Sequence, residues 1–281
     1  MVCCSLFGDE YASNTCRSDI LYSSTWDLKP RFPLLPQIED SNDSIGMLSR
    51  FASTPDSNST TLNPRWFPSN PILLAVIETM RRISRALGSP DLGQPDRAAV
   101  SYRIHLMEHS LLSVHDGRAS PSKSDVSIIT RDLSSPFRLA ALLYFRISIR
   151  ELPSTARMHA TLVHRIRCIL ESSSSSSFLS IVDSYNDNKS LELLAWIAFM
   201  GGATSSNSDD HQYFVGLLIT LCSTLGVQKR AQLQVRLTGI CWREGICDER
   251  LCQLWKEMES FRPRDIYTEG LSAESSGTLP L

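Results

Sequence analysis

Apolar residues recur every three or four positions between residues 69 and 261, the spacing that places side chains on one face of an α-helix. The first run begins after Asn70 and Pro71, because Asn is a favoured N-cap and Pro is favoured at the first helical position. Its apolar positions are Ile72, Leu73, Val76, Ile77, Met80, Ile83 and Leu87. Gly88 and Pro90 are expected to end this helix.

The same spacing predicts further helices along the rest of this region. They cover residues 97–114, a segment opened by Ser135 and Pro136, and residues 155–171, 191–200, 211–225, 228–240 and 248–261. Gly201 and Gly202 are expected to end the helix over 191–200, since glycine readily adopts positive φ. Almost no stretch alternates with period two, so strands are not needed. The pattern predicts an all-α, multi-helix domain.

The two ends of the chain differ from this helical body. Residues 1–68 are rich in Ser, Asn, Asp, Thr and Pro, and residues 262–281 are similar. Such segments bury too little apolar surface to offset the entropy of ordering. We therefore expect a disordered N-terminal arm over 1–68, a helical body over 69–261 and a flexible tail over 262–281.

Composition narrows the class of protein further. The chain has 281 residues, 42% of them hydrophobic, and a formal net charge of −2, which argues against a basic body that coats nucleic acid. The start MVCCSLFGDE lacks the basic region of a secretory signal, so the eight cysteines are expected to be free thiols. The longest apolar stretches are shorter than the ~20 residues of a membrane-spanning helix. We expect a soluble intracellular protein with no membrane partner.

One short motif suggests metal chemistry. His105, Glu108 and His109 form the pattern H-x-x-E-H of inverted zinc metallopeptidases, in which two histidines on one helix face bind zinc and the glutamate acts as a base. Such a site needs a third ligand that no pattern marks here, and those enzymes have mixed α/β folds. The competing interpretation, which we favour, is an ordinary helix surface.

Other candidate sites are weaker. Cys241, Cys247 and Cys252 do not have zinc-site spacing, and a fourth ligand would have to be Cys222 or His211; small core residues are the simpler interpretation. No G-x-S-x-G elbow or glycine-rich phosphate loop is present. The arginines at 81, 82 and 85 fit a solvated helix face better than a phosphate site. The sequence therefore predicts no catalytic residue, no cofactor and no metal.

The segment 191–203 carries the most distinctive pattern. It is an apolar helix with an internal Trp that runs into Gly-Gly, and it is followed by a polar loop and an aromatic-led apolar helix at Tyr213 and Phe214. This pattern resembles the C-terminal part of the fungal-specific transcription factor domain. The signature and core positions are Leu194, Trp196, Phe199, Gly201, Gly202 and Phe214.

The resemblance implies an all-α regulatory region, which in that family is attached to an N-terminal zinc binuclear cluster that binds DNA. That cluster uses six cysteines, whereas the arm of this chain has only Cys3, Cys4 and Cys16 and no basic run after them. DNA contact is therefore expected to be indirect, or to depend on a zinc cluster encoded upstream.

The leading hypothesis is a transcription regulator that acts in the nucleus, or alternatively the cytoplasm, through proteins of the transcription machinery or a dimer partner. One alternative is a small-molecule sensor in which Trp196, Phe199 and Phe214 line a cavity. Another is a zinc hydrolase that uses His105 and His109.

Overall fold

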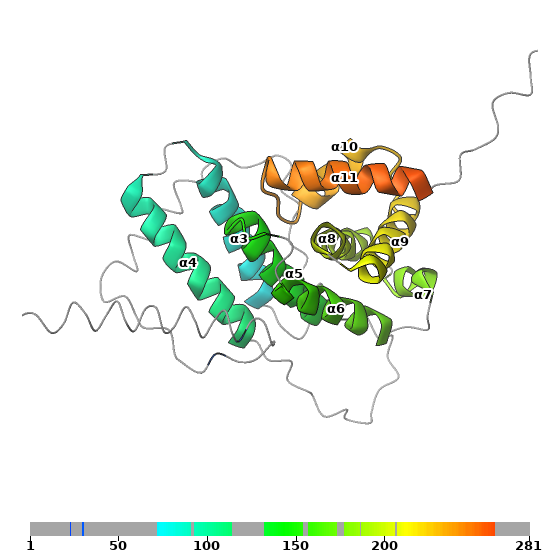
Figure 1. Cartoon of the computed structure of the whole chain (residues 1–281), viewed down its shortest axis with the longest axis horizontal. Helices are drawn as coiled ribbons and strands as arrows, with labels where there is room; N and C mark the ends of the chain where they lie inside the picture. Colours follow the sequence, from blue (N-terminus) through cyan, green and yellow to red (C-terminus); the bar gives the residue numbers. More distant parts are fainter. Residues whose placement is uncertain are drawn as a thin grey trace, which may run out of the picture.

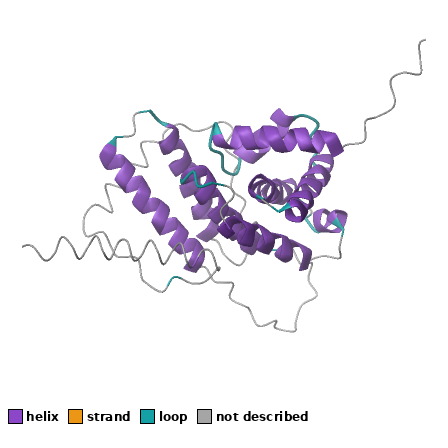
Figure 2. Ribbon diagram, in the orientation of Figure 1, coloured by secondary structure: helices purple, strands orange, loops and turns teal. Residues whose placement is uncertain are grey.

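The computed structural model describes residues 23, 30, 72–90, 93–113, 132–153, 157–172, 177–185, 187–205 and 207–261. Within these ranges the regular secondary structure is helical throughout, as Figure 2 shows. This confirms the all-α prediction. The predicted disordered arm and flexible tail lie outside the described residues, apart from residues 23 and 30.

The helices are numbered in chain order. They are α3 (Ile72–Gly88), α4 (Gln94–Ser113), α5 (Ser134–Tyr144), α6 (Arg157–Ser172), α7 (Phe178–Asp183), α8 (Asn188–Thr204), α9 (Ser208–Thr224), α10 (Arg230–Thr238) and α11 (Ile246–Phe261). A short π-helical turn, Phe145–Ile149, continues α5.

Helix α8 lies at the centre of this arrangement. It packs most extensively on α9 and also contacts α5, α6, α10 and α11. Figure 1 shows α8 end-on, with α10 and α11 on one side and α5 and α6 on the other, while α3 and α4 form the far end of the body. Every residue from Leu191 to Gly202 is buried. A helix that is apolar all round is expected to occupy such a position.

Both ends of α8 differ from the prediction. The helix begins at Asn188 because the Asp187 side chain caps it, accepting a hydrogen bond from the Ser190 backbone N–H at 2.8 Å. It then continues through Gly201 and Gly202 to Thr204, so the expectation that the glycine pair ends the helix was wrong. Neither glycine has positive φ. They lie where neighbouring side chains approach the α8 backbone closely.

The glycine that ends a helix in this region is Gly226, after α9. It has φ of +66°, and its N–H donates to Ser223 O at 3.1 Å while the Val227 N–H donates to Cys222 O at 2.7 Å. These two hydrogen bonds, with a glycine in the left-handed conformation, form a Schellman motif, which commonly ends an α-helix. Asn207 caps the other end of α9, its side chain accepting from the Asp209 N–H. Local signals thus set both ends of α9.

The short helix α7 was not predicted, because it has too few residues to show a clear helical period. The helix opened by Ser135 and Pro136 was expected to include Phe145 and Ile149, but the π-helical geometry of Phe145–Ile149 was not predicted. The other predicted boundaries differ by a few residues; α10, for example, is Arg230–Thr238 rather than 228–240. In the described part of the chain, every helix is too short or too polar to cross a membrane.

Candidate functional site

The signature positions gather around Trp196 in the middle of α8. Its side chain is fully buried, and its indole N–H donates to the Cys241 carbonyl O at 2.8 Å. The rings of Phe137 and Tyr144, both on α5, lie with their centroids 5.8 Å from that of Trp196. One side chain therefore joins α5, α8 and the segment that follows α10.

The other signature residues extend this contact along α8. Phe199 stacks on Trp242 with ring centroids 5.4 Å apart, and Leu194 is fully buried. A Cβ added to Gly201 would lie 2.7 Å from three ring atoms of Phe214, so the missing side chain is what lets α9 pack this closely. These positions act as a packing unit.

The segment between α10 and α11 is also held from α3. Arg81 Nε donates to the Ile240 carbonyl O at 2.9 Å, and its Nη2 donates to the Gly239 carbonyl. Arg81 is only 9% exposed, so the prediction of a solvated face was wrong for this residue. Carbonyls at a helix end favour a cationic donor. Arg81 thus ties the first described helix to the end of α10.

A short buried polar chain lies beside this contact. The Tyr144 hydroxyl and Ser84 Oγ are 2.7 Å apart, and Ser84 Oγ is 3.7 Å from Cys241 Sγ. Burial raises the pKa of Cys241 to about 11, and it also raises the pKa of Tyr144 well above its ordinary value. Both groups therefore hold their protons. This arrangement agrees with Cys241 as a core residue.

The raised pKa of Cys241 predicts that the protein loses stability in alkali. The unfolded thiol ionises near its ordinary value of 9.0, whereas the folded thiol keeps its proton to about pH 11, so rising pH favours the unfolded state. The loss approaches about 1.4 kcal/mol per pH unit for one such group. Burial lowers the pKa of Arg146 to about 10, which acts in the opposite sense above that pH. Burial also raises the pKa of Cys247 from its ordinary value of 9.0, so both buried thiols lower the stability between pH 9 and 10, and comparison with a variant that lacks Cys241 isolates the Cys241 contribution.

Urea unfolding across that window measures the effect. The wild-type free energy of unfolding should fall more steeply than that of a Cys241→Ala variant. Equal slopes in the two proteins would show that Cys241 ionises alike in the folded and unfolded states.

The three residues of the H-x-x-E-H motif do not converge on a common point in the structure. The Glu108 carboxylate accepts two hydrogen bonds from Arg150, Nε at 3.0 Å and Nη2 at 2.6 Å, and its side chain is 4% exposed. His105 Nδ1 contacts the Ser101 carbonyl, and His109 Nδ1 contacts a serine hydroxyl one turn later. A carboxylate held in this way is not available as a base. The expectation of an ordinary helix surface was wrong for Glu108, which forms a buried ion pair.

The cysteines that were weighed as a metal site, and interpreted as small core residues, differ in burial. Cys241 and Cys247 are buried, as is Cys222, and Cys252 is half-buried. Among the described residues, no three or more His, Cys, Asp or Glu side chains are grouped so that they could hold a metal ion.

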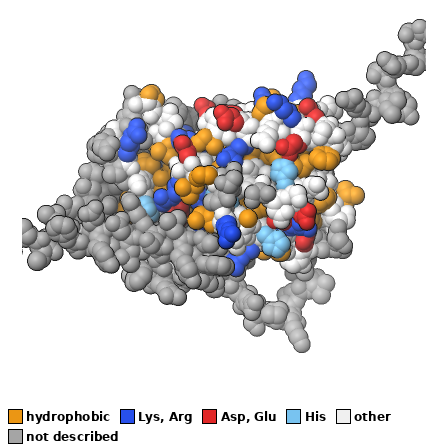
Figure 3. All heavy atoms as spheres, in the orientation of Figure 1, with side chains coloured by type: hydrophobic (Ala, Val, Ile, Leu, Met, Phe, Trp, Pro, Cys, Tyr) orange, Lys and Arg blue, Asp and Glu red, His pale blue; other side chains and the backbone are white. Residues whose placement is uncertain are grey.

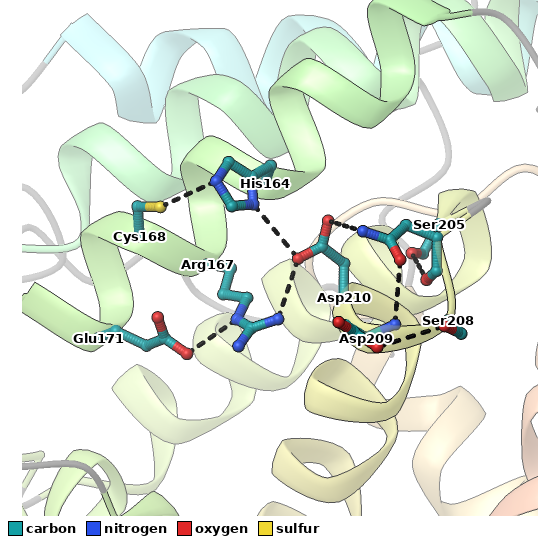
Figure 4. Close-up of polar contacts among 9 residues, drawn as sticks. His164, Arg167, Cys168, Glu171, Ser205, Ser208, Asp209 and Asp210 are labelled. Carbon is teal, nitrogen blue, oxygen red and sulfur yellow. Dashed lines mark hydrogen bonds and ion pairs between the residues drawn. The ribbon is translucent and has the colours of Figure 1, made fainter.

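A polar seam between α6 and α9, which sequence reasoning missed, is shown in Figure 4. Asp210, in the first turn of α9 and 2% exposed, lies 3.2 Å from Arg167 Nη1, 3.4 Å from His164 Nδ1 and 3.5 Å from Asn207 Nδ2. The Arg167 guanidinium also lies over the Tyr213 ring, 5.1 Å from its centroid. His164 and Arg167 are more than 40 positions from Asp210 in the sequence, and no local motif marks the contact between them.

The surface carries mixed charge. On the face shown in Figure 3, the acidic, basic and histidine side chains of the described residues are interspersed with apolar ones. This distribution lacks the single-sign stripe that marks a nucleic-acid interface on that part of the surface.

The described residues thus form a helical domain built around one buried helix, with the signature positions in its core. The chain belongs to the fungal specific transcription factor domain family, whose model matches residues 11–237. This confirms the resemblance seen in the sequence. The match begins within the predicted arm and ends within α10, before α11. Comparisons with curated proteins and with solved structures gave no match.

Proposed function

We propose that this chain is a non-catalytic regulator of transcription that acts in the nucleus by binding protein partners. The observation that carries the proposal is the family match over residues 11–237, which includes the whole of α8 and α9. The partners are proteins of the transcription machinery or a second regulator that forms a dimer with it. DNA contact is indirect in this proposal, in keeping with a formal net charge of −2.

The buried signature residues and the exposed residues have different roles in this proposal. Trp196, Phe199 and Phe214 are at most 1% exposed, so they stabilise the scaffold and cannot themselves touch a partner. Leu179, Val235 and Phe261 are more than half exposed and lie on α7, α10 and α11. Contacts with a partner are therefore left to surface side chains such as these.

The small-molecule alternative gains no support from the rings on which it rested. Trp196 lies against Phe137 and Tyr144, and Phe199 lies against Trp242. Each ring is therefore already in contact with protein. The zinc hydrolase alternative is disfavoured by the Arg150 contact to Glu108.

A tethered reporter tests the proposal. The full chain is fused to an unrelated DNA-binding domain whose sites control a reporter gene in a fungal host. We expect reporter output to differ from that given by the DNA-binding domain alone. A Trp196→Ala fusion is the matched control and should return output towards that baseline, because the scaffold is damaged. The proposal fails if the wild-type fusion accumulates in the nucleus and leaves the reporter at baseline.

A further inference from the structure

Helices α8, α9 and α11 meet at His211, which lies near the start of α9. Its Nδ1 is 3.1 Å from the Gly202 carbonyl O near the end of α8, and its Nε2 is 2.5 Å from Glu257 Oε2 on α11. Each of the three helices packs on the other two, and Figure 1 shows them next to one another. The imidazole of His211 therefore links the end of α8 to the second half of α11.

Both partners of this imidazole are hydrogen-bond acceptors. A carbonyl oxygen and a carboxylate oxygen have no proton to donate, so each contact needs an N–H of the ring. A neutral imidazole has one N–H, whereas an imidazolium has two. If the second proton is placed on Glu257 instead, the pair still holds one proton more than a neutral histidine and a carboxylate. The arrangement therefore requires one bound proton.

The charged groups around this pair are held by other partners. They are Arg250 on α11, Asp210 on α9, and His164 and Arg167 on α6, whereas the end of α8 contributes carbonyl groups and no charged side chain. Arg250 donates to the Ala203 carbonyl O at 2.7 Å, next to the carbonyl that His211 contacts. Asp210 is directed towards its α6 partners, as Figure 4 shows. Glu257 is thus the titratable group that pairs with His211 across the helices.

We propose that His211 and Glu257 form a proton-dependent latch that holds the second half of α11 against α8 and α9. The neutral ring keeps one of the two contacts, so the stabilisation by the latch is present at low pH and is lost as the pH rises. Water reaches the pair, because the two side chains are 28% and 32% exposed.

Release of the latch changes the surface of the protein. The second half of α11 buries Leu254, Trp255 and Met258, none of which is more than 6% exposed. Opening of this segment at higher pH exposes an apolar face that is covered at lower pH. The latch therefore makes the accessibility of one helix face depend on pH.

Hydrogen exchange of the purified full chain, followed by mass spectrometry, tests the proposal. It is measured at about pH 5.5 and about pH 8, on either side of the ordinary imidazole pKa of about 6.5. Each rate is divided by that of the unstructured peptide at the same pH, so the intrinsic pH dependence of exchange cancels. The readout is the protection of residues 251–261, with α5 as the internal reference.

The variants are His211→Gln and Glu257→Gln, each of which replaces one titratable partner by an amide of similar size. His109→Gln on α4 is the matched control, because the His109 ring contacts a serine hydroxyl that both donates and accepts. Circular dichroism checks that all the variants keep their helix content at both pH values.

We expect the wild-type protection of residues 251–261 to fall on the order of fivefold from the lower to the higher pH, a modest effect for one charge-assisted contact at a helix end. The protection of α5 should stay constant. His211→Gln and Glu257→Gln should remove this fall, and His109→Gln should keep it. The proposal is overturned if the wild-type protection does not fall, or if either folded latch variant keeps the wild-type fall.

Discussion

Replacement of Trp196 by Ala is expected to lower the free energy of unfolding by about 3–5 kcal/mol. The fully buried indole contacts Phe137 and Tyr144 and donates a hydrogen bond to the Cys241 carbonyl. Truncation to Ala therefore removes these ring contacts and the hydrogen-bond donor of the Cys241 carbonyl. Equilibrium urea unfolding, monitored by far-ultraviolet circular dichroism, measures the change.

Val235→Ala is the control for this substitution. Val235 is 62% exposed on α10, and its truncation should change the unfolding free energy by no more than about 0.5 kcal/mol. If Trp196→Ala proved as mild as this surface change, α8 could not be the centre of the core.

Replacement of Gly201 by Ala is expected to have the second large effect on the free energy of unfolding. Alanine improves helix propensity by about 1 kcal/mol over glycine. However, its Cβ would lie 2.7 Å from three ring atoms of Phe214, which is fully buried, so the ring has to shift within the core. Overpacking of this kind costs up to about 3 kcal/mol, which leaves a net loss of about 2 kcal/mol.

Gly202→Ala provides a matched comparison one residue later. Its Cβ would meet a Leu254 methyl group at 3.3 Å, and a leucine can adjust by a small rotation. The gain in helix propensity and the cost of the close contact then nearly cancel, and we expect the free energy of unfolding to change by no more than about 1 kcal/mol. Thermal unfolding of the two variants under the same conditions ranks their stabilities. A Gly201→Ala protein as stable as wild type would show that Phe214 does not depend on this glycine.

Most helices of the body could be predicted because they have a long apolar period and local end signals. The first run from Ile72 to Gly88 and the long helix α11 are examples. The glycine pair in α8 was misread because a sequence does not distinguish a glycine that needs positive φ from one that makes room for a neighbouring ring. That distinction depends on Phe214, which belongs to the next helix.

The candidate sites were predictable only where the chemistry is local. The placement of Trp196 follows from an apolar helix, but its acceptor, the Cys241 carbonyl, belongs to a distant segment. Arg81 was expected on a solvated helix face together with Arg82 and Arg85. It is buried because it donates hydrogen bonds to two carbonyls that follow α10. The contact of His164 with Asp210 likewise joins two helices that only the folded chain brings together.

The most direct test of the regulatory function is transcript sequencing in the source cell after depletion of this chain. The expected result is a defined set of transcripts whose levels change, which re-expressed wild-type protein restores and Trp196→Ala protein does not. A transcript profile unaltered by depletion would contradict the account.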